Sequence, residues 1–495
     1  MNNLASLILN AAKVNPAARF GTVERAEPLS TAVNRAACLA GHLTSLGHAR
    51  GSRLALVGAN SADYMATWLA AQLAGIELAL LNPEYPDELL LSMFDDLRPS
   101  AVAWLDRSAA AVELPQIDLR AWWNQHRGEQ PEPPAIDMAQ VQGVHCAASD
   151  ISSFIHTSGT TGKPKFCALS HDYFLRLGRF FADSLCLTRQ DRLFAPLPMF
   201  HINPLGYGLV GGLTAKASVL GTDRFSASQF WPLVKQHRFS ALVLHAAPAI
   251  ILATSTTSAD ARGHEVRIAF GAESTISALF DLPICVGGYG STEAGGLCHS
   301  WHFRAGDPPM AKEGISNFTG RPRYDVDFKV DENEEILVRS KTGQAILSGY
   351  MRGGKLCDAL DDQGWFHTGD RGRIDETTGC LVFIERTNES IRCKGEYVPI
   401  EFVEAHLSKC PSLGGFALWR QPSAITGHEV VIYTQSPEVN LDEVRAVVSA
   451  LPRFMQAQRI IRVKELPRTG IGKVQRSRLD GLPEIDSLPL WETTS

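Results

Sequence analysis

The sequence predicts an α/β protein with a large N-terminal domain of parallel sheets flanked by helices, a small β-rich subdomain and a small C-terminal α+β domain. Apolar strand segments alternate with helical segments through the first part of the chain, which favours parallel sheets covered by helices. Beyond about Gly320 the segments become shorter and alternate in polarity, which favours a small antiparallel region. With 495 residues, of which 45% are hydrophobic, the chain has room for two or more domains.

The N-terminus has the pattern of an amphipathic helix. Apolar residues stand at helical spacing in its first turns, at Leu4, Leu7, Ile8 and Ala11. No basic stretch precedes them, so the segment does not fit a secretory signal peptide. The most apolar segment, Met65 to Leu81, is interrupted by polar residues and a glycine and is too short to cross a bilayer comfortably. We therefore expect no membrane span.

Charge and cysteine usage narrow the class of protein. The 47 Lys and Arg residues against 53 Asp and Glu residues give a net charge of −6, so the molecule has no general attraction to nucleic acid or anionic lipid. The 10 cysteines include no Cys-x-x-Cys pair, so the pattern indicates neither a zinc site nor a disulfide scaffold. A reducing cytoplasm fits this usage best.

Two β-α-β units follow the N-terminal helix. Leu54 to Val57 is an apolar strand, Asn60 or Ser61 is suited to cap the next helix, and Gly75 is suited to end that helix before the second strand. A second unit of the same kind occupies residues 86–105. Such units predict parallel strands in one sheet.

The stretch from His156 to Lys165 has the composition of a phosphate-binding loop. It follows a buried strand and combines two glycines, four hydroxyls and two lysines. Glycines let backbone N–H groups approach an anion, hydroxyls add donors and lysines add charge. The P-loop of kinases and GTPases needs Ser or Thr after Gly-Lys, whereas Pro164 follows Lys163 here. We expect a nucleoside triphosphate as the ligand; a flexible surface turn is the plain alternative.

Later strands are followed by glycines and polar residues. The pattern predicts a helix near Tyr173 to Phe181, a turn at Pro196 to His201, and strands at Ala241 to Leu244, Val266 to Phe270 and Ile284 to Val286. Because open α/β sheets bind ligands at the carboxyl ends of their strands, the residues after these strands are candidates for a binding site.

A cluster of charged and polar residues from Glu385 to Lys394 marks a domain boundary. We place a large domain at residues 1–387 and a small domain at residues 388–495. In the small domain the pattern predicts a helix over Val398 to Leu407 and a strand over Val430 to Tyr433.

Four other segments complete the sequence-based expectations. Val326 to Val330 and Glu335 to Arg339 are the expected antiparallel strands, and Gln130 to Pro134 is an expected loop. The last residues, Leu482 to Ser495, are polar and interrupted by prolines, so we expect a loosely held tail.

Three further motifs supply what a triphosphate site needs. The run Gly288-Tyr289-Gly290-Ser291-Thr292-Glu293 combines an aromatic face for a purine, hydroxyls for a phosphate and a carboxylate for Mg²⁺. The run from Trp365 to Asp370 ends in an acid that looks exposed and suits two ribose hydroxyls. The run from Leu466 to Lys473 places a lysine on a glycine-containing loop. Taken alone, each residue has a non-functional alternative: Glu293 would be a solvated surface acid, and Asp370 would be a turn residue.

Taken in order, these motifs closely resemble those of the acyl-adenylate-forming superfamily, and most closely its acyl-CoA synthetases, or acid–CoA ligases. The superfamily also includes adenylation domains of peptide synthetases and beetle luciferases. The matching motifs begin at Thr157 (Thr-Ser-Gly-Thr-Thr-Gly-x-Pro-Lys), Tyr289 (Tyr-Gly-x-Thr-Glu), Thr368 (Thr-Gly-Asp), Glu385 (Glu-Arg), Lys394 (Lys-Gly) and Gly472 (Gly-Lys). The resemblance covers nearly the whole chain.

The resemblance implies a two-step reaction with ATP, Mg²⁺ and coenzyme A. A carboxylate attacks the α-phosphorus of MgATP, pyrophosphate leaves, and the acyl-AMP then acylates the thiol of coenzyme A. By analogy, Lys473 would bridge carboxylate and phosphate, Thr292 would donate to the α-phosphate and Glu293 would hold Mg²⁺. His201 is a candidate to gate the carboxylate.

The resemblance also implies an ATP-binding set. Asp370 and Arg386 would hold the ribose, while Tyr289 and the Gly271-Ala272-Glu273 segment would flank the adenine. The implied set is Thr157, Ser158, Gly159, Thr160, Thr161, Gly162, Lys165, Gly271, Ala272, Glu273, Gly288, Tyr289, Gly290, Ser291, Thr292, Asp370, Arg386 and Lys473.

The small C-terminal domain would be mobile if the resemblance holds. In the superfamily this domain rotates between the two steps and replaces the lysine loop by a segment that meets the pantetheine, here Lys394 and Gly395. The hinge position matches Asn388, where relatives often carry Asp or Lys. An uncharged hinge leaves the rotation possible, and the sequence does not indicate how it would be controlled. A second departure is Phe166, where the phosphate loop usually continues with glycine; a bulky residue there would stiffen or reshape the loop.

By position in the superfamily, His201, His245 and Gly288 would line the acyl pocket. A plain buried histidine is the alternative for both His201 and His245. Amino-acid adenylation domains carry an aspartate just after the phenylalanine that matches Phe200, and its absence disfavours an amino acid substrate. No motif fixes the chain length or polarity of the acid.

Coenzyme A is the favoured acceptor, and an acyl carrier protein loaded by a stand-alone acyl-AMP ligase is the alternative. A third hypothesis, from another class of function, is a noncatalytic AMP-binding sensor or a luciferase-like oxygenase. Intact Glu293 and Lys473 disfavour a sensor. We expect a cytoplasmic monomer or homodimer that acts on a small carboxylic acid and binds no nucleic acid.

Overall fold

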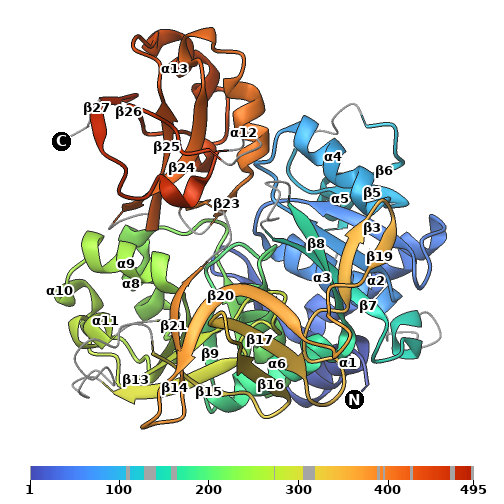
Figure 1. The fold of residues 1–495 in the computed structure, drawn as a ribbon. Helices are drawn as coiled ribbons and strands as arrows, with labels where there is room; N and C mark the ends of the chain where they lie inside the picture. Colours follow the sequence, from blue (N-terminus) through green and yellow to red (C-terminus); the bar gives the residue numbers. More distant parts are fainter. Residues whose placement is uncertain are drawn as a thin grey trace. The chain divides into compact units, whose positions relative to one another are not determined.

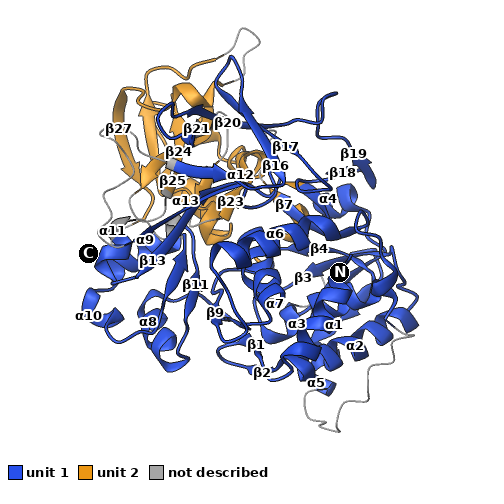
Figure 2. Ribbon diagram, turned by 90° about the horizontal axis from the view of Figure 1, so that it is seen from below, with its two compact units in different colours: residues 1–83, 91–156, 166–386 blue, residues 84–90, 157–165, 387–495 orange. Residues whose placement is uncertain are grey.

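The chain divides into two packed units in a computed structural model (Figures 1 and 2). The first unit comprises residues 1–83, 91–156 and 166–386, and the second comprises residues 84–90, 157–165 and 387–495. The structure describes residues 2–107, 112–126, 141–157, 164–271, 274–304, 318–386, 391–393, 396–423, 427–468 and 474–491. The expected loop at Gln130 to Pro134 lies outside these residues.

One sheet, called sheet I here, contains the two predicted β-α-β units. Its strand order is β19-β18-β8-β7-β4-β3-β5-β6. The strands are β3 (Arg53–Val57), β4 (Glu77–Leu81), β5 (Ala101–Trp104), β6 (Gln116–Asp118), β7 (Ile151–Thr157), β8 (Lys165–Ser170), β18 (Gly349–Arg352) and β19 (Lys355–Cys357). The pairs β3–β4, β3–β5, β4–β7 and β5–β6 are parallel, which confirms the prediction for this part of the chain.

A larger sheet, called sheet II, has both parallel and antiparallel parts. Its order is β16-β17-β20-β21-β15-β14-β13-β12-β11-β9-β10-β1-β2. The strands are β1 (Arg19–Thr22), β2 (Ala26–Pro28), β9 (Arg192–Phe194), β10 (Ser218–Gly221), β11 (Ala241–Val243), β12 (Ile268–Phe270), β13 (Ile284–Tyr289), β14 (His299–Arg304), β15 (Phe318–Pro322), β16 (Val326–Val330), β17 (Glu335–Ser340), β20 (Phe366–Ile374) and β21 (Leu381–Arg386). From β1 through β10, β9, β11 and β12 to β13 the pairing is parallel. From β13 to β16 it is antiparallel, as predicted, and these strands continue the same sheet.

The helices before residue 386 connect these strands. They are α1 (Leu4–Val14), α2 (Leu29–Ser45), α3 (Ala62–Ala74), α4 (Asp87–Leu97), α5 (Leu119–His126), α6 (His171–Ser184), α7 (Gly211–Ala215), α8 (Ala227–Gln236), α9 (Ala246–Ser255), α10 (Ser258–Ala261) and α11 (Ser274–Leu279), with the 3-10 turn η2 (Gln142–His145) and the π-helical η3 (Asn203–Val210). Ser61 caps α3 by accepting a hydrogen bond from the N–H of Tyr64 at 3.0 Å. Gly75 ends α3 in the left-handed region at φ +74°.

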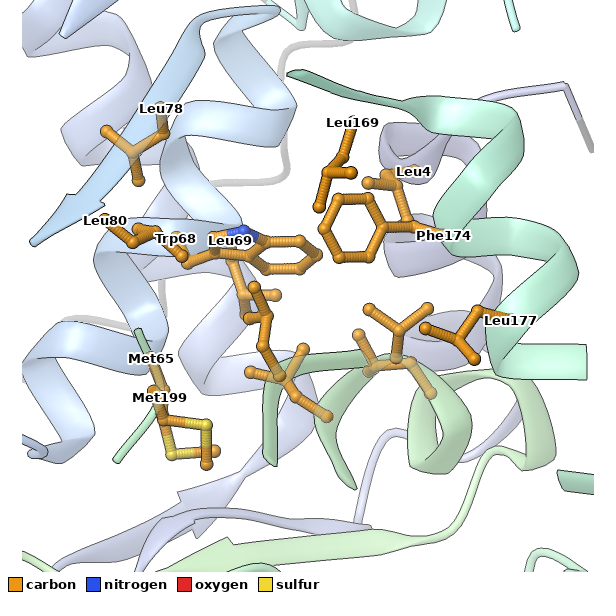
Figure 3. Close-up of a cluster of buried hydrophobic side chains, with 14 of the residues drawn as sticks. Leu4, Met65, Trp68, Leu69, Leu78, Leu80, Leu169, Phe174, Leu177 and Met199 are labelled. Atoms are coloured by element: carbon orange, nitrogen blue, oxygen red, sulfur yellow. The ribbon is translucent and has the colours of Figure 1, made fainter. Parts of the chain in front are cut away.

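Helix α3 explains why the chain has such an apolar segment near its start. None of its residues is more than 7% exposed, and it packs against α1 and α2. Trp68 packs against Phe174 of α6 (Figure 3), with ring centroids 6.2 Å apart. Its Nε1 donates to the hydroxyl of Ser153 at 3.2 Å. Within the described part of the chain, no helix combines the length and apolar character that a membrane span requires.

The second unit contains a separate sheet, called sheet III. Its strands are β22 (Ile391–Cys393), β23 (Glu396–Val398), β24 (Phe416–Ser423), β25 (Gly427–Thr434), β26 (Arg459–Val463) and β27 (Glu484–Pro489), in the order β23-β22-β25-β26-β27 with β24 paired to β25. Its helical segments are α12 (Ile400–Leu407), η4 (Pro411–Leu413), α13 (Leu441–Ser449), η5 (Arg453–Met455) and η6 (Arg476–Arg478). The predicted helix and strand are confirmed, although Val398 ends a strand instead of beginning the helix.

The expectation of a loosely held C-terminal tail is wrong for residues 484–491. Strand β27 pairs antiparallel with β26 at the edge of sheet III. Leu490 is 1% exposed and donates its N–H to the carbonyl of Gln458 at 3.0 Å. Pro489 suggested a break, but an edge strand tolerates proline because one side of its backbone needs no partner.

We expect Leu490→Ala to lower the free energy of unfolding by about 2–5 kcal/mol, because it leaves a cavity in the second unit. Ile485→Ala is the matched control on the same terminal segment, since Ile485 is 63% exposed; its effect is expected to stay within about 0.5 kcal/mol. Urea denaturation followed by tryptophan fluorescence measures both. Equal effects of the two variants would show that the terminal segment is not anchored.

Candidate active site

The carboxyl ends of four neighbouring strands of sheet II lie at one edge. Strands β9, β11, β12 and β13 are parallel neighbours, so the chain leaves each of them in the same direction. They are followed by the segments that contain His201, His245, Gly271 and Thr292, respectively. Parallel pairing therefore gathers candidates that lie far apart in the sequence.

Hydrogen bonds to backbone carbonyls tie these strand ends together. The side-chain amide of Asn203 donates to the carbonyl of Leu244 at 2.9 Å, which links the His201 segment to the end of β11. Gly271 donates its N–H to the carbonyl of Val286 at 3.0 Å. Its φ is +79°, and an added Cβ would lie 2.5 Å from the oxygen of Leu244. Only glycine fits at this position.

Tyr289 and Asp370 form a buried hydrogen-bonded pair. The Tyr289 hydroxyl donates to Oδ2 of Asp370 at 2.7 Å. Asp370 is 1% exposed, so the expectation of an exposed acid is wrong. A carboxylate can be buried there because the Tyr289 hydroxyl supplies a donor. Burial, and then the charge of Asp370, raise the pKa of Tyr289 well above its ordinary value, so the phenol stays a donor.

The part of strand β20 that carries Asp370 is itself fixed, so Asp370 is a strand residue and the alternative of a turn residue is wrong. The N–H of Asp370 donates to the hydroxyl of Thr368 at 3.0 Å, and that hydroxyl donates to the carbonyl of Ile336 at 2.7 Å. The preceding residue of the strand, Gly369, donates its N–H to Glu335 at 2.9 Å. The position of the Asp370 carboxylate is thus determined by strands β13, β17 and β20 together.

Thr292 and Glu293 follow directly after β13. Thr292 is 8% exposed, and Glu293 is half-buried. The turn before them is tight, since an added Cβ at Gly290 would lie 1.7 Å from the carbonyl oxygen of Gly296. Likewise, an added Cβ at Gly288 would lie 2.4 Å from the carbonyl oxygen of His299. Such glycines allow the backbone to follow a path that any side chain would block.

Tyr350 is a neighbour of Glu293 that the sequence did not indicate. It lies on β18, and its hydroxyl is 3.5 Å from Oε1 of Glu293. Burial, followed by the charge of Glu293, raises the pKa of Tyr350. In the sequence, a tyrosine in a short strand indicates only ordinary packing. The contact with Glu293 becomes visible only in the structure, where β18 pairs with β8 in sheet I.

An aromatic cluster surrounds His201. The rings of Phe200 and His201 have centroids 4.7 Å apart. His156, which is 2% exposed, lies 6.1 Å from Phe200 and 6.2 Å from His201. His201 and His245 are both half-buried, so neither is a fully enclosed core residue.

Several sequence-predicted site residues lie outside the described part of the chain. These are Ser158, Gly159, Thr160, Thr161, Gly162, Ala272, Glu273, Asn388, Lys394, Gly395 and Lys473. On either side of the phosphate loop, the buried Thr157 ends β7 and the half-buried Lys165 begins β8. Phe166, the departure noted above, is fully buried in β8 opposite Met351. Arg386 pairs through its backbone with Asp370.

The donor set suits Mg²⁺ only if a ligand contributes oxygens. No group of three or more His, Cys, Asp or Glu side chains able to hold a metal occurs among the residues that the structure describes. Mg²⁺ commonly binds through one or two carboxylates together with substrate phosphates. Glu293 fits that role, because its side chain is partly exposed and its carboxylate oxygens are the kind of ligand that Mg²⁺ prefers.

His299 lies behind Tyr289 and was not singled out from the sequence. It pairs with Tyr289 across β13 and β14, and its ring lies 5.9 Å from Tyr289 and 4.6 Å from Phe328. Its Nε2 has no hydrogen-bond partner within the described chain. Burial lowers the pKa of His299 to about 3. The imidazole of His299 is therefore neutral where it packs against Tyr289, the residue expected to flank the adenine.

The chain belongs to the AMP-binding enzyme family, whose model matches residues 30–353. This finding confirms the resemblance expected from the motifs.

Named relatives extend the match over most of the chain. A 3-[(3aS,4S,7aS)-7a-methyl-1,5-dioxo-octahydro-1H-inden-4-yl]propanoyl:CoA ligase of Mycobacterium tuberculosis is 25% identical over 469 residues, covering 88% of this chain and 90% of the relative. A 4-coumarate–CoA ligase 3 of Arabidopsis thaliana is 24% identical over 480 residues, covering 89% of this chain and 84% of the relative.

A solved structure shows the same fold. A double mutant of the o-succinylbenzoate CoA synthetase of Bacillus subtilis, bound with its product analogue, superposes with a TM-score of 0.79 at 19% identity and covers 98% of this chain and 99% of that chain. The same enzyme has been solved with ATP and a magnesium ion, and that structure gives a TM-score of 0.66. The expected α/β class with a small C-terminal unit is confirmed.

We expect His299 to make the protein less stable as the pH falls. The pKa of His299 is about 3 in the folded protein, below its ordinary value of 6.5. Between about pH 3 and pH 6.5 the unfolded chain therefore binds a proton at His299 that the folded chain does not. Each pH unit below about 6.5 then costs about 1.4 kcal/mol. In His299→Phe, the loss of unfolding free energy from about pH 7.5 to about pH 5 should shrink by about 2 kcal/mol.

His367 provides a control of opposite sign. Its hydrogen bond to Glu335 raises the pKa of His367, so its stabilisation is full below pH 6.5 and is lost as the pH rises through the raised pKa. His367→Phe should therefore enlarge the loss at acid pH. Urea unfolding at several pH values measures both variants, and profiles parallel to that of the wild type would contradict the two assignments.

Proposed function

We propose that this AMP-binding enzyme is an ATP-dependent acid–CoA ligase. In the first step a carboxylate oxygen attacks the α-phosphorus of ATP, and pyrophosphate leaves with formation of acyl-AMP. In the second step the thiol of coenzyme A attacks the acyl carbon, and AMP leaves. The observation that carries this proposal is the joint placement of the Tyr289–Asp370 pair and the Thr292-Glu293 segment at the end of β13.

The geometry supports a nucleotide at this strand end. Asp370 and Arg386 hold the ribose, and Tyr289 with the 271–273 segment flanks the adenine. Thr292 donates its hydroxyl to the α-phosphate, and the loop from Thr157 to Lys165 binds the phosphate tail through backbone N–H groups, hydroxyls and lysine charge. In this proposal ATP is the substrate that completes the site.

In this proposal Glu293 would hold Mg²⁺, which would supply positive charge beside the phosphates. The protein's own contribution is to keep the Glu293 carboxylate in place beside Thr292. Removal of one preorganised group of this kind typically costs about 10²–10³-fold in rate. Two observations support the assignment: the partial exposure of Glu293, and the magnesium and ATP seen together in the structurally similar Bacillus subtilis enzyme.

The acid binds beside the nucleotide, where His201, His245 and Gly288 line its pocket. Support comes from the common edge of sheet II on which all three lie. In this proposal His201 gates the carboxylate; its partial exposure beside the ring of Phe200 supports an accessible imidazole there. The substrate is a small-molecule carboxylic acid.

Residues 388–495 form the mobile domain of this proposal, with residues 1–387 as the large domain. Lys473 meets the carboxylate and the α-phosphate during adenylation. Rotation about Asn388 then brings Lys394 and Gly395 to the pantetheine of coenzyme A. Separate packing of most of this region as its own unit supports the assignment.

Coenzyme A, and not an acyl carrier protein, is the proposed acceptor. The Mycobacterium tuberculosis and Arabidopsis thaliana relatives named above are both CoA ligases by name. We also propose a cytoplasmic location, which the ten free cysteines support. Assembly as a monomer or a homodimer stays a prediction.

A pyrophosphate-release assay over a panel of carboxylic acids tests the function. The panel should include aromatic, short-chain and long-chain acids, each with and without coenzyme A. We expect at least one acid to give ATP-dependent pyrophosphate release and, with coenzyme A present, a thioester identified by mass spectrometry. Acyl-AMP without any thioester would favour the carrier-protein alternative, and absence of acyl-AMP with all acids would contradict the proposal.

Substitutions at the two opposite ends of the proposed rotation should separate the half-reactions. Lys473→Ala is expected to abolish acyl-AMP formation while the thioester still forms from preformed acyl-AMP. Gly395→Leu is expected to do the reverse, because a bulky side chain would obstruct the pantetheine. Single-turnover assays of each step measure the split. Equal loss of both steps in Lys473→Ala would refute its assigned role.

Tyr289→Phe should raise the KM for ATP by about tenfold, because a hydrogen bond to a charged group contributes about 1.5–3 kcal/mol. Asp370→Asn should raise the same KM by more. In the double variant the two effects should not add, since the residues act as one pair. Additive effects on the KM would show that Tyr289 does not act through Asp370.

A further inference from the structure

We propose that Tyr173 is a positioning residue that fixes the Thr292-Glu293 segment through its backbone. The inference rests on the proposed function, in which Thr292 meets the α-phosphate and Glu293 meets Mg²⁺. Tyr173 touches neither of these groups, and its effect passes through the Thr292 carbonyl.

The contact itself is short and fully enclosed. Tyr173 is 0% exposed, and its hydroxyl donates to the carbonyl oxygen of Thr292 at 2.9 Å. A buried carbonyl without a partner is costly, so this hydrogen bond favours one position of the Thr292 backbone. Burial is the largest cause that raises the pKa of Tyr173 well above its ordinary value, so the hydroxyl keeps its proton at working pH.

Tyr173 is anchored in turn by the strand that leaves the phosphate loop. It lies in the first turn of α6, and its N–H donates to the hydroxyl of the N-cap residue Ser170 at 3.1 Å. Ser170 is the last residue of β8. The short path from β8 through Ser170 and Tyr173 to Thr292 thus connects the exit of the phosphate loop with the residue proposed to contact the α-phosphate.

The residues after Thr292 are also held through their backbone carbonyls. The carbonyl of Glu293 accepts the N–H of Leu347 at 3.0 Å. Arg323, which is 1% exposed, donates to the carbonyls of Gly295 at 2.9 Å and Leu297 at 3.2 Å. None of these contacts uses the Thr292 hydroxyl. These hydrogen bonds thus fix residues 292–297 through their backbone carbonyls, and they do not use the side chains of Thr292 and Glu293.

Among these contacts, the Tyr173 bond is the one made to Thr292 itself. Loss of it should displace the Thr292 hydroxyl slightly, and a small displacement of a group that contacts the transition state can cost up to about 10²-fold in rate. The protein should also lose some stability, because the buried carbonyl of Thr292 is left without its donor.

Tyr173→Phe tests the inference, and Tyr64→Phe is its matched control. Tyr64 is 1% exposed in the same unit, and its hydroxyl has no hydrogen-bond partner in the described chain. Both changes remove one buried phenolic hydroxyl. We expect acyl-AMP formation to be about tenfold slower in Tyr173→Phe, and to stay at the wild-type rate in Tyr64→Phe.

Two measurements do not depend on turnover. Titration with MgATP in the absence of acid should show severalfold weaker binding by Tyr173→Phe. Hydrogen exchange with mass spectrometry should show faster exchange in the peptide that covers residues 291–298, because the N–H of Gly296, bonded to the carbonyl of Ser291 at 2.8 Å, lies in this segment. Neither quantity should change in Tyr64→Phe.

Identical rates, MgATP binding and exchange in the two variants would overturn the inference. If the wild type activates no acid, the proposed function fails, while binding and exchange still decide the role of Tyr173. Should Tyr173→Phe not fold, Ser170→Ala replaces it, because that change loosens the turn that carries Tyr173. It is expected to slow acyl-AMP formation about two- to threefold and to speed exchange in the same peptide; an unchanged rate and exchange would overturn the inference.

Discussion

Parallel pairing of β9, β11, β12 and β13 is the constraint on which the candidate active site depends. Each strand is short, and each is followed at once by a segment that supplies a candidate residue. Because parallel neighbours point the same way, residues separated by long stretches of sequence meet at one edge. Local features then refine the site: the left-handed Gly271 admits the Leu244 carbonyl, and Asn203 ties two of the segments together.

Burial of polar groups gives the site its second level of organisation. Asp370 can be buried because Tyr289 donates to it, and Tyr289 is in turn backed by the neutral ring of His299. A buried polar group cannot move away from its partner without losing a hydrogen bond. Burial therefore fixes the positions of these side chains. The same reasoning applies to the backbone that follows β13, whose carbonyls face donors from three separate parts of the chain.

The sequence predicted much of the fold because its signals there are local. Capping by Ser61 and the stop at Gly75 depend on the residue itself, and both are confirmed. The exposure of Asp370 was predicted wrongly because the partner that allows its burial comes from a distant strand. Tyr173 was predicted to be part of a helix, but which carbonyl its hydroxyl meets depends on tertiary packing. The strand β27 was missed because its pairing with β26 outweighs its polar, proline-containing composition.

The two sheets of the first unit are interleaved along the chain. Sheet II begins with β1 and β2, sheet I takes β3 to β8, sheet II takes β9 to β17, and the chain then returns to sheet I for β18 before ending in sheet II at β21. During synthesis, β8 therefore lacks its β18 neighbour until the 178 residues from 171 to 348 have been added. Contacts so distant in sequence form slowly and leave strand edges open. A nascent chain of this topology therefore keeps one edge of β8 unpaired until late in synthesis, and a fragment that ends before β18 would lack that neighbour.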